Sequence, residues 1–298
     1  MKDFYLTIDI GGTTFTSGLF NSNLELIAIS KESYIKDYID KDSLINVFVN
    51  KVKILCHDKN ITLNKVFALG VSAPGPLDST EGKILDTPNL IILKYTNLVK
   101  ELESRLKIPV KLENDANLFA LGEWYLKYKM KKVLIGVTLG SGLGFGIIIN
   151  NKLFTGANGM AAEYGISPFG SGVWEDKISI DGINNLSSKY YNKVFSPKEI
   201  FTFSNNKDKK AIEIWKHFGY DLGLVLSHVV NLLDPDVISI GGGISQAFNF
   251  FKENMIKSLT KYSPSFNHNN IQLMQSKQYL HSIHQGAVLL INDEKNYN

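Results

Sequence analysis

The sequence predicts an α/β protein built from two similar lobes. Short buried strands alternate with amphipathic helices along the 298 residues, a pattern typical of α/β folds. A hairpin of two strands around a glycine turn stands near the start of each half, and this recurrence is a weak internal repeat. The length allows two domains, each with a core of its own.

The composition is that of an ordinary globular protein, with 44% hydrophobic and 20% charged residues and a net charge of +3. Lysines are scattered and no basic stripe is interleaved with aromatic residues, so nucleic acid and membrane are disfavoured as partners. The single cysteine, Cys56, allows no internal disulfide. Without a signal peptide or a bilayer-length apolar run, we expect a cytoplasmic protein.

The first hairpin carries residues suited to phosphate. Strands are expected over residues 4–10, 15–20 and 24–30. The turn between the first two contains Gly11, Gly12, Thr13 and Thr14. Its backbone N–H groups and threonine hydroxyls suit a phosphate, and Asp9 suits Mg²⁺ or a metal-bound water. The alternative is a plain type I′ hairpin.

A loop rich in proline and glycine follows a helix expected over residues 43–57 and a strand over 66–71. It contains Gly75 and Asn89. Such loops are often only turns; alternatively, this one presents backbone groups and Asn89 to a polar ligand. A short helix is expected over residues 98–106.

A polar cluster, Glu113-Asn114-Asp115-Ala116-Asn117, stands where a strand ends and a helix begins. Apolar residues then recur at helical spacing: Leu118, Phe119, Leu121 and Trp124. Asn114 or Asp115 could simply cap that helix. The alternative is that Asp115 is a catalytic carboxylate, placed where open α/β sheets bind ligands, and takes a proton from a substrate hydroxyl.

The second half of the chain contains a similar hairpin with a glycine turn. A hairpin over residues 133–149 has a glycine turn at which Ser141 and Gly142 could bind phosphate, and the loops beyond it contain Glu163 and Glu175. Both glutamates either turn inward or are solvated, and isolated glutamates are more often solvated. Residues 189–206 are expected to be irregular, with a helix start at Ser196.

A long amphipathic helix over residues 211–233 is expected to pack in the core, with His217 and His228 as packing or surface residues. The next strand ends in three glycines, including Gly242 and Gly243, which suit either the close approach of an adenosine group or a helix entry at Ser245. Residues 281–291 predict a last helix.

Five elements in this order resemble the ROK family (repressors, open reading frames and sugar kinases). They are Asp9-Ile10-Gly11-Gly12-Thr13, Ala73-Pro74-Gly75 with Pro88-Asn89-Leu90, the cluster 113–117, Gly140-Ser141-Gly142-Leu143-Gly144, and Asn231-Leu232-Leu233-Asp234-Pro235 with Gly241-Gly242-Gly243. The resemblance spans almost the whole chain. The third and fifth elements are specific, whereas the glycine turns alone are common.

The resemblance implies an actin-like (ribonuclease H-like) ATPase fold with two lobes and a central cleft for ATP and a sugar. The N-terminal lobe would take residues 1–116, with a C-terminal helix at about 284–298 packing back on it. The C-terminal lobe would take residues 117–283. A homodimer is also implied.

The resemblance further implies the residue roles. Asp115 would deprotonate the sugar hydroxyl that attacks the γ-phosphoryl group, and Asn114 would position the sugar. Sugar hydroxyls would be contacted by Gly75, Asn89, Glu163 and Glu175. Phosphates and nucleoside would be contacted by Asp9, Gly11, Gly12, Thr13, Thr14, Ser141, Gly142, Gly242 and Gly243. Mg²⁺ would bridge the β- and γ-phosphates.

The chain departs from many relatives at a cysteine-rich zinc segment. Ile166 and Val173 stand where zinc ligands would be, and neither side chain can ligate, so we expect no zinc. Packing by Tyr164, Ile166, Val173 and Trp174 is expected in its place. Phe145 also replaces a glycine that is common beside the second turn.

Zinc-free versions of the pattern occur among bacterial N-acetylmannosamine kinases and some β-glucoside kinases. The resemblance therefore implies ATP-dependent phosphorylation of the 6-hydroxyl of N-acetylmannosamine (sialic acid catabolism), with Ile166 and Tyr164 suiting the N-acetyl methyl group. A glucokinase or β-glucoside kinase is the alternative. A sugar-responsive repressor fits less well, because we expect no helix-turn-helix before the strand at Phe4.

Overall fold

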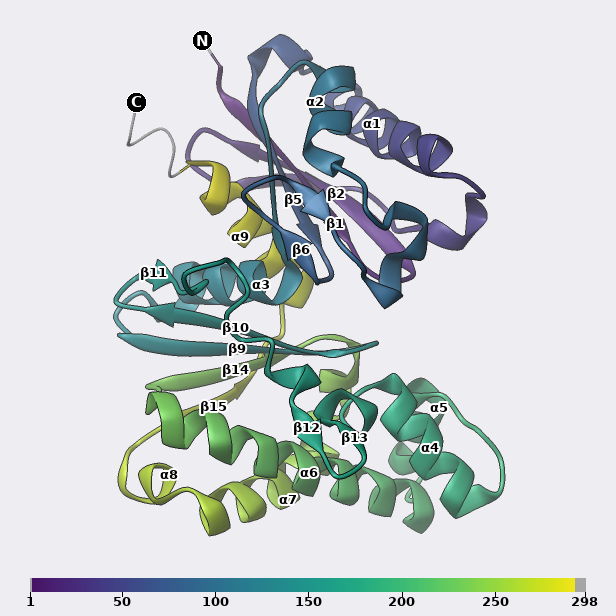
Figure 1. The fold of residues 1–298 in the computed structure, drawn as a ribbon, viewed down its shortest axis with the longest axis vertical. Coiled ribbons are helices and arrows are strands. Elements are labelled where there is room, and N and C mark those ends of the chain that lie inside the picture. The colour runs from purple at the N-terminus through teal and green to yellow at the C-terminus, as the bar shows by residue number, and fades with distance from the viewer. Residues whose placement is uncertain (1, 293–298) are drawn as a thin grey trace. The chain divides into compact units, whose positions relative to one another are not determined.

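The computed structural model describes residues 2–292, apart from the side chain of Asn89, and it contains two compact units. Unit 1 comprises the chain up to Lys127, then Thr155–Ala161, and the chain from Leu280 on. Unit 2 comprises Tyr128–Phe154 and Ala162–Tyr279. Each unit is a mixed α/β body with a sheet of its own (Figure 1), so the predicted fold class is confirmed.

The sheet of unit 1 has the strand order β3-β2-β1-β5-β8, and β4 pairs with β2. The strands are β1 (Phe4–Ile10), β2 (Thr14–Asn21), β3 (Leu26–Ile29), β4 (Ser33–Tyr34), β5 (Val66–Ala73) and β8 (Val110–Asn114). The first three strands form the expected antiparallel meander, whereas β5 and β8 run parallel to β1. A small separate hairpin joins β6 (Leu77–Asp78) to β7 (Lys83–Ile84).

Alternating side chains of β1 face two different layers, as the period of a strand requires. Leu6 and Ile8 join a core with helices α1 (Lys41–Asp58) and α2 (Leu98–Leu106). Tyr5 points the other way and packs against Val288 of α9 (Tyr279–Asn292). The sheet of unit 1 is therefore covered on both faces.

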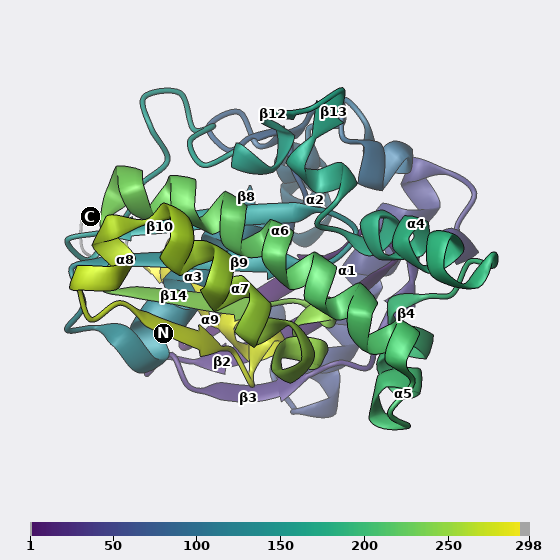
Figure 2. The same cartoon turned by 90° about the horizontal axis from the view of Figure 1, so that it is seen from below.

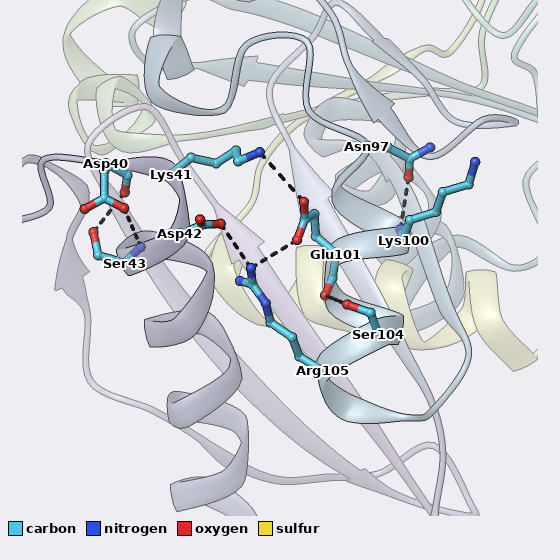
Figure 3. A network of polar contacts seen from close by, with 9 residues as sticks. All are labelled: Asp40, Lys41, Asp42, Ser43, Asn97, Lys100, Glu101, Ser104 and Arg105. Carbon is cyan, nitrogen blue, oxygen red and sulfur yellow. Dashed lines mark hydrogen bonds and ion pairs between the residues drawn. The ribbon is translucent and has the colours of Figure 1, made fainter.

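Helices α1 and α2 begin side by side and share polar contacts (Figure 3). Asp40 caps α1 by accepting from the Ser43 N–H at 2.8 Å, and Asn97 caps α2 by accepting from the Lys100 N–H at 2.9 Å. The Arg105 guanidinium lies 3.1 Å from a carboxylate on each helix. These contacts fix the first turns of both helices over the sheet.

The sheet of unit 2 has the order β11-β10-β9-β14-β15. Its strands are β9 (Val133–Leu139), β10 (Leu143–Ile149), β11 (Lys152–Leu153), β14 (Val237–Gly241) and β15 (Gln272–Gln275). The predicted long helix is α6 (Lys209–Leu233), which runs beside α7 (Phe248–Tyr262) and shares a core with it. Both helices lie in front of the sheet of unit 2 in Figure 2. Smaller elements are β12 (Pro168–Phe169), β13 (Gly172–Val173), α4 (Ile180–Tyr191), α5 (Pro197–Asn205) and α8 (Pro264–His268).

Short helical turns complete the described chain. They are η1 (Ile35–Asp37), η2 (Leu63–Lys65), η3 (Pro88–Leu93), η4 (Trp124–Tyr128), η5 (Tyr164–Ile166), η6 (Trp174–Asp176) and η7 (Gly243–Ala247). Within residues 2–292 no helix is both long and apolar enough to cross a membrane.

The expectation that residues 189–206 are irregular is wrong in part. The predicted helix start at Ser196 is correct, because Ser196 and Glu199 form a capping box for α5. The end of α4 also falls inside this stretch. The residues of α4 are mostly polar, which hid its helical period from the sequence pattern.

The expected lobe boundaries at residues 116 and 283 differ from the observed units mainly by helix α3 (Asp115–Glu123). This helix packs closely on α9. A side chain on Gly122 would meet the Ser282 backbone, and one on Gly286 would meet the Leu118 backbone. Because α9 lies on the sheet of unit 1, this contact places α3 in the same unit.

A fully buried histidine ties α9 to the meander. His284 Nδ1 lies 2.7 Å from the Thr7 hydroxyl and Nε2 lies 3.0 Å from the Thr16 hydroxyl. Gly18 leaves room for the ring, because a side chain there would collide with Thr7 and His284. Burial lowers the pKa of His284 to about 3, helped by the nearby His281.

This buried imidazole should make folding stability depend on pH. The unfolded state protonates the ring below about pH 6.5 while the folded state keeps it neutral, so stability falls as the pH drops from 6.5 toward 3. We expect the wild type to lose about 2 kcal/mol more than His284→Gln between pH 8 and pH 5. Urea unfolding of both proteins across this pH range measures the two free energies of unfolding. An equal loss in both proteins would contradict the neutral buried ring.

Candidate functional site

Three parallel strands of unit 1 end side by side and collect the predicted residues at one edge. In the pairing of β1 with β5, Asp9 lies opposite Ser72, and in that of β5 with β8, Ser72 lies opposite Glu113. Asn114 and Asp115 follow at once, and Gly75 follows the end of β5. Two strand spacings put the ends of β1 and β8 about 10 Å apart. This carboxyl edge is where sheets of this kind place ligands.

Asp9 is held at this edge by a serine that the sequence analysis did not single out. The Ser72 hydroxyl donates to Asp9 Oδ1 at 2.7 Å. Burial raises the pKa of Asp9 to about 6, although the bond from Ser72 opposes the rise. The only signal in the sequence was that Ser72 ends a buried strand, which does not reveal its partner.

The first glycine turn joins β1 to β2 just beyond Asp9. The Gly11 N–H donates to the Thr14 carbonyl at 2.8 Å, which closes the turn. Thr13 is exposed, and its carbonyl accepts from the Ile35 N–H at 2.9 Å. Gly12 stands between them and is half-buried. The turn therefore closes a hairpin, but it is not of the type I′ that the plain alternative named, because neither Gly12 nor Thr13 has a positive φ. It stands beside Asp9 in the sequence.

The cluster at the start of α3 contains the helix cap that was one of the two alternatives left open by the sequence. Asn114 is the N-cap: its Oδ1 accepts from the N–H groups of Ala116 at 2.9 Å and Asn117 at 3.3 Å. Glu113 braces the cap, because its Oε1 accepts from the Asn114 N–H and from the Asn117 side chain. Burial raises the pKa of Glu113 despite these bonds.

Asp115 is the first residue of α3, and its half-buried carboxylate lies at the positive end of the helix. Its Oδ1 accepts from the Ala116 N–H at 2.8 Å. Asn114 is therefore the N-cap of α3, and Asp115 follows it at the edge of the sheet. The backbone of Asn89 lies in η3, but its side chain lies outside the described part of the structure.

In unit 2 the second glycine turn is bound by one of the predicted glutamates. Glu175 Oε2 accepts from the Leu143 N–H at 2.9 Å, directly after the turn between β9 and β10. Gly142 permits this contact, because a Cβ there would come within 2.3 Å of the same oxygen. Burial raises the pKa of Glu175, while the Leu143 bond lowers it. Ser141 is exposed at the tip of the turn.

Glu163 lies near enough to Glu175 for the two charges to interact. Glu163 is exposed, as the solvated alternative expected, but desolvation by the protein around it raises its pKa, and the negative charge of Glu175 raises the pKa further. The structure thus brings both predicted glutamates together in unit 2. A pair of like charges in one place suits a ligand that offers hydroxyl donors.

The packing expected in place of a zinc segment holds for Trp174 but not for Ile166. Trp174 is only 2% exposed and stacks on Phe169 with ring centroids 3.9 Å apart. Ile166 is 60% exposed, because the single turn η5 points it away from the core. Within residues 2–292, no three or more His, Cys, Asp or Glu side chains are grouped to hold a metal.

Phe145 packs inward rather than distorting the second turn. It lies in β10 opposite Val137, is 4% exposed, and meets the ring of Tyr164 edge-on at 6.1 Å. A phenylalanine therefore fits here because Tyr164 provides a partner ring. The hydroxyl of Tyr164 in turn bonds to His228, a contact that helical periodicity alone could not reveal.

The third glycine turn forms the helix entry that was one of the two roles considered for it. Gly242 has φ of +88° and lies so close to the Leu139 backbone that a side chain would clash. Its carbonyl accepts from the Ser245 N–H and hydroxyl, which starts η7. Gly243 is exposed, with open space beside it. A helix entry and an accessible backbone surface thus coincide.

The model of the ROK family matches residues 5–294 of the chain. This protein belongs to the ROK family. An N-acetyl-D-glucosamine kinase of Photobacterium profundum is 29% identical over 279 residues, which cover 87% of this chain and 89% of that protein.

Solved structures of ROK-type proteins share the fold of this ROK protein. A ROK family glucokinase from Streptomyces griseus, in complex with glucose and AMPPNP, matches with a TM-score of 0.83 at 23% identity over 96% of this chain and 98% of its own. A candidate N-acetylmannosamine kinase from Listeria monocytogenes matches with a TM-score of 0.78 at 24% identity over 98% of this chain and 100% of its own. The two units thus have the actin-like ATPase fold that the motifs implied.

The Asp9–Ser72 contact yields a prediction for the metal-free protein. We expect the Asp9 carboxyl to titrate near pH 6 in a carbon-13 NMR titration of labelled aspartates. Ser72→Ala removes the donor that favours the charged form, so the pKa of Asp9 should rise further. Titration of Asp9 below pH 4.5, or a fall in its pKa in Ser72→Ala, would contradict this geometry.

Proposed function

We propose that this ROK protein transfers the γ-phosphoryl group of ATP to the 6-hydroxyl of an N-acetylhexosamine, with N-acetylmannosamine as the leading substrate. The protein is a sugar kinase of its family, an ATP-dependent hexose or hexosamine phosphotransferase. The observation that carries the proposal is the place of Asp115, at the end of β8 and the start of α3.

Asp115 acts as the general base. Phosphoryl transfer needs little covalent help from the protein, but the attacking hydroxyl must be oriented and lose its proton. The cap formed by Asn114 fixes the first turn of α3 and so the backbone that carries this carboxylate. The Oδ1 of Asn114 serves the cap, and its amide nitrogen is left to donate to a sugar oxygen.

The first hairpin turn receives phosphate through Gly11, Gly12, Thr13 and Thr14. Asp9 beside it fits Mg²⁺, which prefers one or two carboxylates together with waters and substrate phosphates. When bound, the cation would neutralise charge on the β- and γ-phosphates. In unit 2, Ser141 and Gly142 are assigned to phosphate, and Gly242 and Gly243 to the nucleoside.

Sugar recognition is assigned to Glu163 and Glu175 in unit 2, and to Gly75 and Asn89 in unit 1. Carboxylates accept from sugar hydroxyls, and their proximity in unit 2 supports this role. The exposed Ile166, beside Tyr164, offers an apolar contact for an acetyl methyl group. Since Ile166 and Val173 cannot ligate, we propose that no zinc is bound.

N-acetylglucosamine is the second candidate, because the Photobacterium profundum relative is an N-acetyl-D-glucosamine kinase over nearly the same length. Glucose and β-glucosides come after the two acetylated sugars. A sugar-responsive regulator would need no base at residue 115. We also propose a cytoplasmic homodimer, which rests on family resemblance alone.

A coupled assay of ADP release tests the substrate assignment. The panel comprises N-acetylmannosamine, N-acetylglucosamine, glucose, mannose and a β-glucoside, each with ATP and Mg²⁺. We expect the highest kcat/KM with N-acetylmannosamine. A higher value with glucose would overturn the acetylated substrate, and no ADP release with any sugar would overturn the kinase.

Replacement of the base should slow turnover severely without unfolding the protein. We expect Asp115→Asn to lower kcat about 10²- to 10⁴-fold, the range that a positioned general base contributes. The side chain of Asn can still accept from the Ala116 N–H, so the melting temperature should change little. A kcat within ten-fold of the wild type would exclude Asp115 as the base.

A further inference from the structure

Glu163 and Glu175 of unit 2 each have an aromatic neighbour in the sequence, and helix α6 contacts both aromatic side chains. Tyr164 follows Glu163, and Trp174 precedes Glu175. The Tyr164 hydroxyl shares a 2.7 Å hydrogen bond with Nδ1 of His228 on α6. The indole of Trp174 meets the same imidazole edge-on, with ring centroids 5.8 Å apart. One side chain of α6 thus links the two segments that carry the glutamates.

The two segments differ in how firmly they are held. Trp174 is buried and stacked on Phe169, and the carboxylate of Glu175 is tied to the Leu143 N–H. Tyr164 lies in a single helical turn and packs edge-on against Phe145 at 6.1 Å. Its hydroxyl bonds to His228 and also to the Trp174 side chain. The Glu163 segment is therefore tied to the rest of the unit through one hydroxyl, which meets His228 and Trp174 together.

A charge on α6 faces the segment that follows Glu175. The Lys177 ammonium lies over the Phe169 ring, 5.0 Å from its centroid. Burial raises the pKa of Asp221 on α6, and the positive charge of Lys177 opposes that rise. Asp221 precedes His228 by seven residues, which puts both on one face of α6. The face of α6 that carries His228 thus also carries a charge opposite to that of Lys177.

The like charges of Glu163 and Glu175 explain why such a support is needed. Two carboxylates that interact through space repel each other, and a mobile pair would move apart. Sugar binding requires both acceptors at a fixed separation, since misplaced hydrogen-bond partners lose affinity. A link through a shared imidazole opposes the repulsion without neutralising either carboxylate.

We propose that His228 is a positioning residue for sugar binding, which holds Tyr164 and Trp174 together and so fixes Glu163 relative to Glu175. The inference rests on the proposed function, because it takes these glutamates as the sugar contacts. His228 itself touches no substrate. Its loss should weaken sugar binding while leaving nucleotide binding and the chemical step intact.

Four variants and a matched control separate this role from a general structural one. Tyr164→Phe removes the hydroxyl and keeps the ring, and His228→Leu removes the nitrogen. The double variant combines these two changes. His228→Asn puts an amide near the place of Nδ1 and should restore the link. His268→Leu, on α8 of the same unit, is the control for replacing an exposed histidine.

We expect Tyr164→Phe and His228→Leu each to raise the KM for the sugar about three- to ten-fold, the effect of one lost hydrogen bond of ordinary strength. The double variant should raise the KM for the sugar no further than the single variant with the larger effect. The KM for ATP and kcat should stay within two-fold throughout, as should every constant of His228→Asn and His268→Leu. An unchanged sugar KM, additive effects, or an equal rise in the KM for ATP would overturn the proposal.

Hydrogen–deuterium exchange provides a readout that needs no turnover. Amides of residues 163–176 should exchange at least three-fold faster in Tyr164→Phe and His228→Leu, and at the wild-type rate in the control. Should the wild type phosphorylate no sugar, the proposed function fails, and this exchange still tests the link. Unchanged exchange in both variants would overturn the positioning role whatever the activity.

Discussion

The junction between β8 and α3 is the constraint on which the account of this protein depends. A strand that ends in Glu113-Asn114 and a helix that begins at Asp115 leave no linker between them. The free N–H groups of the first helical turn must then be satisfied locally, and Asn114 does this with one oxygen. Because Glu113 in turn accepts from the Asn114 N–H, the backbone that carries Asp115 is fixed at the edge of the sheet.

Unit 2 holds its predicted carboxylates in place by different contacts from those of unit 1. Glu163 and Glu175 come from short turns rather than from a strand end, so regular structure does not fix them. Glu175 is held by the backbone of the second glycine turn, and aromatic packing around Trp174 stiffens the loop. Rings and a histidine of α6 are the supports that the structure provides there.

Local features of the fold could be predicted because local patterns determine them. The meander, the long helix α6 and the strand-to-helix junction follow from apolar periodicity and glycine turns. Asn114 and Asp115 were both considered as caps, and only hydrogen-bond geometry separates their roles. Helix α4 was missed because its sequence is mostly polar.

Contacts between distant residues could not be predicted from one sequence. Ser72 and Asp9 are 63 residues apart, and Tyr164 and His228 are 64 apart. Nothing in their local pattern indicates these partners, since strand pairing and helix packing bring them together. Ile166 was expected to pack with its neighbours in place of a zinc segment, yet it is exposed, because its burial depends on the path of a loop.

The most direct test of the central claim is the site of phosphorylation in the product. Phosphorus-31 NMR of the sugar product should show coupling to the protons on carbon 6 after reaction with the wild-type enzyme and ATP. The same signal should be absent from a matched incubation with Asp115→Asn. A phosphate on the anomeric oxygen, or the same 6-phosphate formed at a similar rate by Asp115→Asn, would contradict the assignment of this carboxylate as the base.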